Sequence, residues 1–340
     1  MTDADRERYS RQILFAGLGE EGQRRLLASR AVIVGCGALG SFHAAALARA
    51  GAGEIVIIDR DFVEPSNLQR QWLFDESDAE QALPKAAAAA AKLRAVNRSV
   101  RVEACMSDLT AENAERLLLP AAVILDGTDN FETRYLINDL AVQQGVPWIY
   151  GAAVGSYGVT MPILPGESAC LACVFPEPPA GAQPTCDTAG ILNSITSLIA
   201  SLQAADALKI MAGKRADVEP RLLTADVWQN TMRTVSTRDR DPNCAVCGKR
   251  EFAYLRGRRR RPVSLCGRNA VQVRGQSEQL DLAALRKTLE PLGQVRSNEY
   301  VLRFFCPPYE MTIFPDGRAI IKGTEDAGVA RSLYARYIGG

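Results

Sequence analysis

The sequence predicts an α/β fold with a mostly parallel sheet, and three features of the stretch 30–71 support this prediction. An apolar run at 31–34 has the length and composition of a buried parallel strand. A glycine-rich turn and a segment with helical periodicity follow it. A second run rich in β-branched residues, 55–58, then leads to an aspartate. Strand, turn, helix and strand in this order are typical of a Rossmann-like sheet.

The turn carries three glycines at the spacing G-x-G-x-x-G, namely Gly35, Gly37 and Gly40. Gly35 and Gly37 allow a tight turn and a close approach of the backbone to a phosphate, and Gly40 allows the helix to pack closely on the strand. The start of the following helix offers N–H groups and a partial positive charge to an anion. Asp59, at the end of the second strand, suits a ribose hydroxyl. The pattern therefore predicts a nucleotide site.

The residues after Asp59 indicate which nucleotide chemistry is favoured. The fingerprint alone favours an NAD(P)- or FAD-dependent enzyme, and an NAD(P)-dependent oxidoreductase stays open as an alternative. Three polar residues, Asn67, Arg70 and Gln71, crowd the segment just past the strand. A nicotinamide needs an apolar pocket there, whereas polar donors and a guanidinium suit a triphosphate that is being split.

The stretches GCGALG and D-F-V-E-P-S-N-L-Q-R-Q resemble the ThiF/MoeB/HesA adenylyltransferases, which are relatives of the ubiquitin-activating enzymes. The resemblance is closest to the ThiF type, dense over about 8–248 and loose beyond it. It implies that ATP is the cofactor and that Asn67, Arg70 and Gln71 help to hold it. It also implies a second subunit, because in this family the second arginine of an R-Y-x-R-Q motif, here Arg11, reaches the phosphates of its neighbour. We therefore expect a homodimer, with a solvated arm as the alternative.

Lys85 is the next candidate for the phosphate site. Pro84 and a run of alanines predict a helix start, which places Lys85 in the first turn, where the helix dipole disfavours a cation. A nearby anion would offset this, and a solvated lysine that tolerates the small penalty is the alternative. The resemblance assigns Lys85 to the phosphates. Before this helix we expect a polar, acidic loop at 75–80. Asn97 is expected to cap the C-terminal end of the helix.

A strand at 100–104, a helix at 112–119 and a strand at 122–125 precede the sequence Asp126-Gly127-Thr128-Asp129-Asn130. Ligands of open parallel sheets gather at the carboxyl ends of the strands, where a pair of aspartates suits Mg²⁺. A turn or a helix N-cap is the alternative for Asp126. The motif D-x-T-D-N matches the family, where the residue at Asp129 handles the metal, and we place Asp126 and Asn130 in the nucleotide site with it. A helix at 131–144, a strand at 146–150 and a hairpin over 151–165 are expected next.

Two C-x-x-C pairs, Cys170 with Cys173 and Cys244 with Cys247, predict a structural Zn²⁺ site that staples remote segments together. A redox dithiol or two buried pairs are the alternatives. The segment 175–190 between them is rich in proline and glycine and is expected to be mobile. It carries Cys186, whose thiol pKa is expected to be lowered near a helix N-terminus. In ThiF-like relatives the matching cysteine forms a covalent sulfur link with the carrier, and a structural cysteine is the alternative.

A long apolar helix beginning near Ile191 is expected to pack one stripe against the core or a twin subunit; the stripe consists of Ile191, Ile195, Leu198, Leu202 and Ala205. Polar and charged residues within 191–213 argue against a membrane span. Near balance of 40 Lys and Arg against 39 Asp and Glu gives no reason to expect nucleic-acid or membrane binding. With nine cysteines and no visible secretory signal, we expect a cytoplasmic location. The single histidine, His43, is expected to pack or to form a local hydrogen bond.

The expected domains are an adenylation domain with the four-cysteine site over 1–255 and a small α/β domain over 256–340. The basic run 256–261 is expected to be a solvated linker. A strand at 270–273, a helix at 280–289, three short strands and a helix at 327–337 are expected to follow. Cys266 only faintly resembles a sulfurtransferase loop, and Gly339-Gly340 resembles a ubiquitin tail but is expected to end a helix.

From the resemblance we predict ATP-dependent adenylylation of the C-terminal glycine of a small ubiquitin-like sulfur carrier of the ThiS or MoaD kind. This step prepares sulfur transfer in thiamine or molybdopterin biosynthesis, with a sulfurtransferase or a cysteine desulfurase as a possible further partner. Arg11, Arg70 and Lys85 are expected to clamp the phosphates, and Asp129 is expected to hold Mg²⁺. A zinc-stapled scaffold that binds a ubiquitin-like partner without turnover is the non-enzymatic alternative.

Overall fold

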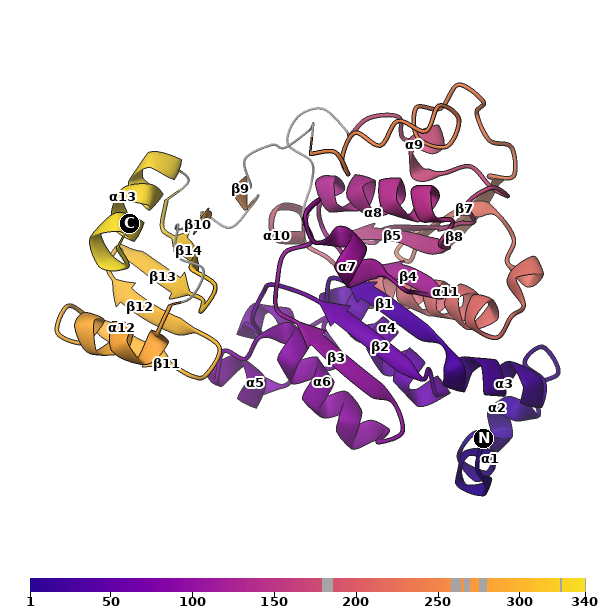
Figure 1. The fold of residues 1–340 in the computed structure, drawn as a ribbon, viewed down its shortest axis with the longest axis horizontal. Helices are drawn as coiled ribbons and strands as arrows, with labels where there is room; N and C mark the ends of the chain where they lie inside the picture. The colour runs from indigo at the N-terminus through magenta and orange to yellow at the C-terminus, as the bar shows by residue number, and fades with distance from the viewer. Residues whose placement is uncertain (179–185, 258–263, 266–269, 275–279, 325, 340) are drawn as a thin grey trace. The chain divides into compact units, whose positions relative to one another are not determined.

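The computed structural model describes residues 1–178, 186–257, 264–265, 270–274, 280–324 and 326–339. The chain forms two compact units, Met1–Arg260 and Arg261–Gly340 (Figure 1). The first unit contains the helical segments α1 Asp3–Arg8, α2 Ser10–Ile13, α3 Gly19–Ala28, α4 Ala38–Ala50, η1 Pro65–Asn67, α5 Glu76–Glu80, α6 Lys85–Val96, α7 Ala114–Leu118, α8 Phe131–Gln144, α9 Leu171–Val174, α10 Cys186–Ala189, α11 Asn193–Met211 and η2 Arg215–Asp217. Its strands are β1 Arg30–Val34, β2 Glu54–Ile58, β3 Arg101–Cys105, β4 Val123–Asp126, β5 Trp148–Val154, β6 Tyr157–Ile163, β7 Arg221–Asp226 and β8 Thr231–Ser236.

The sheet of the first unit has the strand order β3-β2-β1-β4-β5-β6-β7-β8. The first five strands are parallel, and β6, β7 and β8 extend the sheet with antiparallel pairs. Val34 at the end of β1 pairs with Ile58 on one side and with Asp126 on the other. The segments that follow β1, β2 and β4 therefore leave the sheet side by side, at what we call its carboxyl edge.

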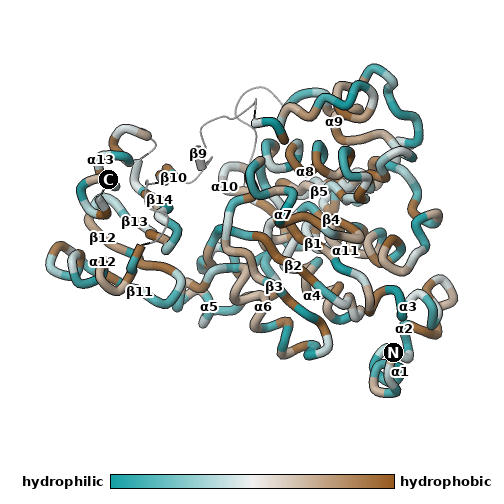
Figure 2. Tube along the Cα trace, viewed as in Figure 1, coloured by the Kyte–Doolittle hydropathy of each residue, from teal (hydrophilic) through white to brown (hydrophobic). Residues whose placement is uncertain are grey.

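Two apolar layers cover the two faces of this sheet, so its central strands are hydrophobic without interruption (Figure 2). Ile33 and Ile57 face a layer that includes Leu47 of α4. Val32 faces the opposite layer, which includes Leu140 of α8. Because these strands are packed on both faces, their ends have fixed positions. The loops of the carboxyl edge therefore start from fixed points.

The second unit contains a six-stranded sheet of order β11-β12-β13-β14-β10-β9, with antiparallel neighbours. Its elements are β9 Ser264–Leu265, β10 Ala270–Arg274, α12 Leu282–Leu289, β11 Gln294–Ser297, β12 Leu302–Cys306, β13 Tyr309–Ile313, β14 Arg318–Lys322 and α13 Ala327–Tyr337. Its own core includes Phe304, Met311, Ile321 and Tyr334. This unit therefore buries a hydrophobic core separate from that of the first unit.

The expected α/β fold with a parallel-rich sheet is confirmed, and several local predictions need correction. The segment 75–80 is not a loop, because Asp75 caps the helix α5 by accepting the N–H of Asp78. The strands β7 and β8 were not predicted. On α11 the buried stripe includes Ile195 and Ile199, whereas Ala205 is exposed. The basic residues 258–261, Cys266, Gly340 and part of the segment 175–190 lie outside the described residues.

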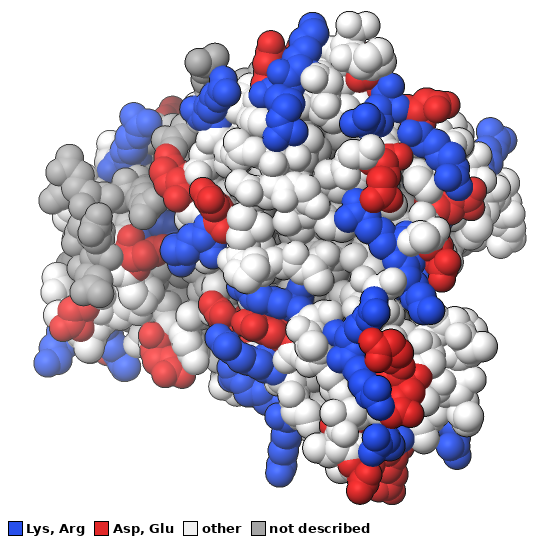
Figure 3. Space-filling view, turned by 45° about the vertical axis from the view of Figure 1, so that its right-hand side comes forward, with Lys and Arg blue, Asp and Glu red and all other residues white. Residues whose placement is uncertain are grey.

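Charges are mixed on the surface. On the face drawn in Figure 3, Lys and Arg side chains lie among Asp and Glu side chains, as the near balance of the two kinds in the sequence predicts. The pair of Arg24 with Glu20, 2.7 Å apart on one face of α3, is an example. Among the described residues, no helix has the length and apolar character that crossing a membrane would need.

Candidate nucleotide and metal sites

The three glycines of the turn differ in the space that the backbone leaves for a side chain. Gly35 has a φ of 85°, and a Cβ there would lie 2.6 Å from the carbonyl oxygen of Gly127. A Cβ on Gly40 would overlap the carbonyl oxygen of Gly35. A Cβ on Gly37 would meet nothing closer than 3.9 Å. Gly35 and Gly40 thus make the path of the chain possible, whereas Gly37 leaves open space where α4 begins.

Asp59 connects this turn to the end of β2. Its Oδ2 accepts the backbone N–H of Cys36 at 2.6 Å, and its Oδ1 accepts that of Asp61 at 2.6 Å. Burial raises the pKa of Asp59, and the charge of Lys85 and the two N–H donors oppose this rise. The carboxyl group therefore holds the glycine turn against β2, and it lies at the carboxyl edge where a ribose hydroxyl was predicted.

Lys85 is buried, with 3% of its surface exposed. Its Nζ lies 3.3 Å from Oδ2 of Asp61, and its backbone N–H donates to the carbonyl oxygen of Asp61 at 2.8 Å. The anion expected near Lys85 is thus at least in part a carboxylate of the chain itself. This pair holds the ammonium group in the first turn of α6, next to Asp59.

The loop after β2 contains the other polar residues that the sequence singled out. Asn67 is buried, and its Oδ1 accepts the N–H of Glu64 at 3.2 Å. Arg70 donates from Nη1 to the carbonyl oxygen of Ser66 at 2.8 Å. Gln71 is 3% exposed, and its Nε2 is the side-chain atom that a Cβ on Gly37 would approach. Its Oε1 has no hydrogen-bond partner among the described residues, so a buried polar atom beside the glycine turn is left for a ligand.

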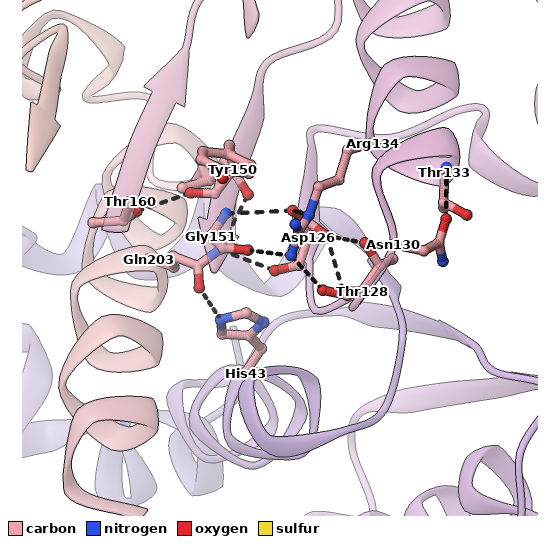
Figure 4. A network of polar contacts seen from close by, with 11 residues as sticks. His43, Asp126, Thr128, Asn130, Thr133, Arg134, Tyr150, Gly151, Thr160 and Gln203 are labelled. Atoms are coloured by element: carbon pink, nitrogen blue, oxygen red, sulfur yellow. Dashed lines mark hydrogen bonds and ion pairs between the residues drawn. The ribbon is translucent and has the colours of Figure 1, made fainter. Parts of the chain in front are cut away.

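The end of β4 shows which of its polar residues are already engaged (Figure 4). Asp126 accepts the N–H and the hydroxyl of Thr128 with Oδ1, at 2.9 and 2.7 Å. Its Oδ2 accepts from Nε of Arg134 at 3.1 Å. Burial raises the pKa of Asp126, and Arg134 lowers it. Asn130 caps α8 by accepting the N–H of Thr133, whereas Asp129 is exposed. Both carboxylate oxygens of Asp126 are thus engaged by the chain itself, whereas Asp129 is exposed just before the following helix.

Two residues that we did not predict organise this region. Arg134 is buried and also donates to the carbonyl oxygens of Thr128, at 2.6 Å, and Gly151, at 3.2 Å. Gln203 of α11 donates to the carbonyl oxygens of Asp126 and Ile149, both at 3.1 Å. In the sequence each of the two appears only as a polar residue within a helix. Many surface residues have the same appearance, so this signal does not identify them.

His43 is buried, which agrees with the expected packing role, but its hydrogen bond is not local, because its partner Gln203 lies 160 residues away in the chain. Since Nε2 of Gln203 donates to two carbonyl groups, its Oε1 must accept, and His43 donates to it from Nε2 at 3.0 Å (Figure 4). Burial lowers the pKa of His43 to about 3. The imidazole is therefore neutral and connects α4 to α11.

Arg11 is not near the other phosphate candidates of its own chain. It is exposed on α2, and the segment around it is fixed at the opposite edge of the sheet. Asn97 donates to the hydroxyl of Tyr9 at 2.8 Å, and Gln12 donates to the carbonyl oxygen of Ala50 at 2.8 Å. Ala50 ends α4, whose start lies at the glycine turn, so Arg11 and Lys85 lie at opposite edges.

The four cysteines of the C-x-x-C pairs come together. Their sulfur atoms all lie within 4.8 Å of one another. The distance from Cys170 is 3.9 Å to Cys173 and 3.7 Å to Cys244, and Cys173 lies 3.3 Å from Cys247. A tetrahedral Zn²⁺ with bonds of about 2.3 Å requires sulfur atoms roughly 3.8 Å apart, so the donor set fits this ion. Cys186 begins α10 and lies apart from this group, with its sulfur 4.0 Å from the carbonyl oxygen of Ala153.

The parallel-rich sheet with a glycine turn at its carboxyl edge is typical of nucleotide-binding α/β proteins, and this chain adds a four-cysteine cluster. The sequence profile of the ThiF family matches residues 9–246, so the chain belongs to the ThiF family. The resemblance found in its motifs is thereby confirmed.

Relatives of known name support the same assignment. The chain is 44% identical to the sulfur carrier protein ThiS adenylyltransferase of Bacillus subtilis, over 98% of this chain and 99% of that protein. It is 40% identical to the sulfur carrier protein adenylyltransferase of Thermus thermophilus, over 73% of this chain and 92% of that protein. A crystal structure of E. coli MccB shares the fold, with a TM-score of 0.63 and 23% identity over 72% of this chain and 74% of that one.

Proposed function

We propose that the chain is an ATP-dependent adenylyltransferase that acts on the C-terminal glycine of a small ubiquitin-like sulfur carrier. The observation that carries this proposal is the 44% identity to a ThiS adenylyltransferase over nearly the whole of both chains. Membership of the ThiF family supports it. The polar carboxyl edge supports it against an oxidoreductase, because Lys85, Asp61 and the amide of Gln71 do not make an apolar nicotinamide pocket.

The reaction activates a poor electrophile. The carboxylate of the carrier's last glycine attacks the α-phosphorus of ATP, a new P–O bond forms, and the bond to the β-phosphate oxygen breaks. The products are an acyl adenylate and pyrophosphate. Negative charge shifts onto the leaving pyrophosphate, so catalysis consists mainly of positioning and of cations placed around the phosphates. The adenylate is then open to attack by a sulfur nucleophile.

Residues of the carboxyl edge have separate parts in this proposal. The start of α4 at Gly37 receives a phosphate, and Lys85 and Arg70 neutralise phosphate charge. Asp59 and Asn67 position the nucleoside and the phosphate ends, with Gln71 beside the turn. Asp126 and Asn130 shape the loop after β4 through the hydrogen bonds described above. Asp129 would hold Mg²⁺, which neutralises phosphate charge when it is bound.

We further propose that Cys170, Cys173, Cys244 and Cys247 hold one structural Zn²⁺. Four thiolates leave no open coordination position, so the ion would staple α9 to the segment around 244–247 and take no part in the chemistry. For Cys186 we propose a covalent sulfur link with the carrier. The carrier would be of the ThiS or MoaD kind, with a sulfurtransferase or a cysteine desulfurase upstream, and the second unit would be a separate domain.

The test is the release of pyrophosphate from ATP in the presence of a carrier that ends in Gly-Gly. We expect release to require the carrier and to disappear when its last glycine is deleted, which serves as the matched control. ATP should also protect the protein against thermal unfolding, whereas NAD(H) should not. Protection by NAD(H) alone, or no release with any carrier of this kind, would contradict the proposal.

A further inference from the structure

Helix α8 has two buried polar residues that the nucleotide site does not use, Asn138 and Asp139. Oδ1 of Asn138 accepts the backbone N–H of Leu171 at 2.9 Å, and Leu171 directly follows Cys170. Oδ2 of Asp139 accepts the N–H groups of Tyr254, at 2.8 Å, and Leu255, at 3.3 Å. These two neighbouring residues of one helix thus bind both segments that carry the cysteine pairs.

A third residue of α8 contacts the same two segments. Tyr135 donates its hydroxyl to the carbonyl oxygen of Phe175 at 2.6 Å, just beyond Cys173. Its ring stacks on that of Tyr254, with the ring centroids 5.0 Å apart. One aromatic side chain therefore holds both segments, the segment after Cys173 through its hydroxyl group and the segment after Cys247 through its ring.

These contacts matter for the metal because the two cysteine pairs are far apart in the sequence. Seventy residues separate Cys173 from Cys244, so bringing the pairs together costs chain entropy, which contacts within the fold can offset before the metal binds. Backbone N–H groups bound to buried oxygen atoms of a regular helix fix the position of each segment without the ion. Such supporting partners typically change metal affinity by about 10- to 100-fold.

We propose that Asn138 and Asp139 are positioning residues of the four-cysteine site, which hold its two halves at metal-binding distance. The proposal rests on the zinc site proposed above and goes beyond it, since it assigns part of the zinc affinity to residues that are not ligands. A purely structural role of the two residues would change the melting temperature and leave the zinc affinity of the folded protein unchanged.

The experiment measures zinc affinity on the full-length reduced protein by competition with a chromogenic chelator, after circular dichroism has confirmed folding. We expect Asn138→Ala and Asp139→Ala to weaken zinc binding by about tenfold or more. Asp139→Asn keeps an acceptor oxygen and should restore affinity to within a few-fold. Gln144→Ala, at the exposed last residue of α8, is the matched control and should bind as the wild type does.

Three results would decide against the proposal or its premise. Folded Asn138→Ala and Asp139→Ala proteins that bind zinc as tightly as the wild type would overturn the positioning role. If neither alanine variant folds, Asn138→Ser and Asp139→Ser, which keep a polar group but shorten the side chain that accepts the N–H, take their place, and an unchanged zinc affinity there would overturn it equally. Wild-type protein purified without zinc, and unable to bind it, would reject the metal site itself.

Discussion

At the scale of single residues, Lys85 shows how the chain keeps a cation buried at the carboxyl edge. The ammonium group lies 3.3 Å from the carboxylate of Asp61, so its charge is compensated in part before any ligand arrives. The helix dipole of α6 disfavours a cation at this place, and the negative charge of Asp61 opposes that effect. A phosphate that approaches would compete for the same cation.

Removal of this cation should lower activity in a protein whose folding is first checked by circular dichroism. We expect Lys85→Met to lower carrier-dependent pyrophosphate release by about 100-fold or more, because the charge that develops in the reaction loses a partner. Lys92→Met is the matched control, since Lys92 lies on the same helix and pairs with Asp75 and Asp78. Its rate should stay close to that of the wild type. A Lys85→Met protein with an undiminished rate would remove Lys85 from the phosphate site.

His43 should make stability depend on pH. Its pKa is about 3 in the folded protein against 6.5 when unfolded, so the unfolded state binds the proton first as pH falls. The contribution of the neutral imidazole to the free energy of unfolding is complete above pH 6.5. It is lost progressively below this pH, by about 2 kcal/mol at pH 5. We expect the difference in unfolding free energy between the wild type and His43→Gln to fall by this amount from pH 7.5 to pH 5 in denaturant titrations. A difference that stays constant with pH would show that folding does not lower the pKa of His43.

At the scale of elements, the glycine turn separates a structural glycine from a functional one. Gly40→Ala places a methyl group on the carbonyl oxygen of Gly35, so we expect loss of folding or a large drop in melting temperature. Gly37→Ala has room, and we expect its melting temperature to stay close to that of the wild type. Its ATP affinity should fall by about tenfold, because the methyl group occupies the approach of a phosphate to α4. Calorimetry with ATP measures this, and unchanged affinity would move the phosphate elsewhere.

Elements that are buried on both sides were the most predictable. The strands β1 and β2 and the helix α8 lie where the sequence predicted them. Their apolar patterns are each compatible with one type of secondary structure. The strand β8 was missed, since all six of its residues are exposed and their pattern shows no buried face. The helix α5 was missed because it is only five residues long and acidic, and its reciprocal caps, Asp75 and Asp78, decide its structure.

At the scale of the whole molecule, the position of Arg11 supports our proposal that two subunits share a site. It lies at the edge of the sheet opposite the glycine turn and Lys85, because its neighbours Tyr9 and Gln12 bind Asn97 and the end of α4. We therefore expect mixtures of Arg11→Ala and Lys85→Ala subunits to regain activity, because one of the two sites in each hybrid dimer has both residues intact. Random exchange should restore about a quarter of the wild-type rate. A mixture that exchanges subunits and stays as inactive as either parent would contradict the trans arm.

The sequence by itself determined the class of sheet, the nucleotide turn, the pairing of cysteines and the family, because each depends on residue types at short, fixed spacings. Only the tertiary structure decided which polar residues are already engaged. Asp126 and Asn130 look like ligands in the sequence, yet their oxygens accept hydrogen bonds from the loop and helix that follow. Arg134, Gln203 and Asp139 act on segments 6 to 116 residues away, at distances that local patterns do not encode. The physical reason is that a hydrogen bond is satisfied by whichever group the fold brings within reach, and chain separation places no limit on that choice.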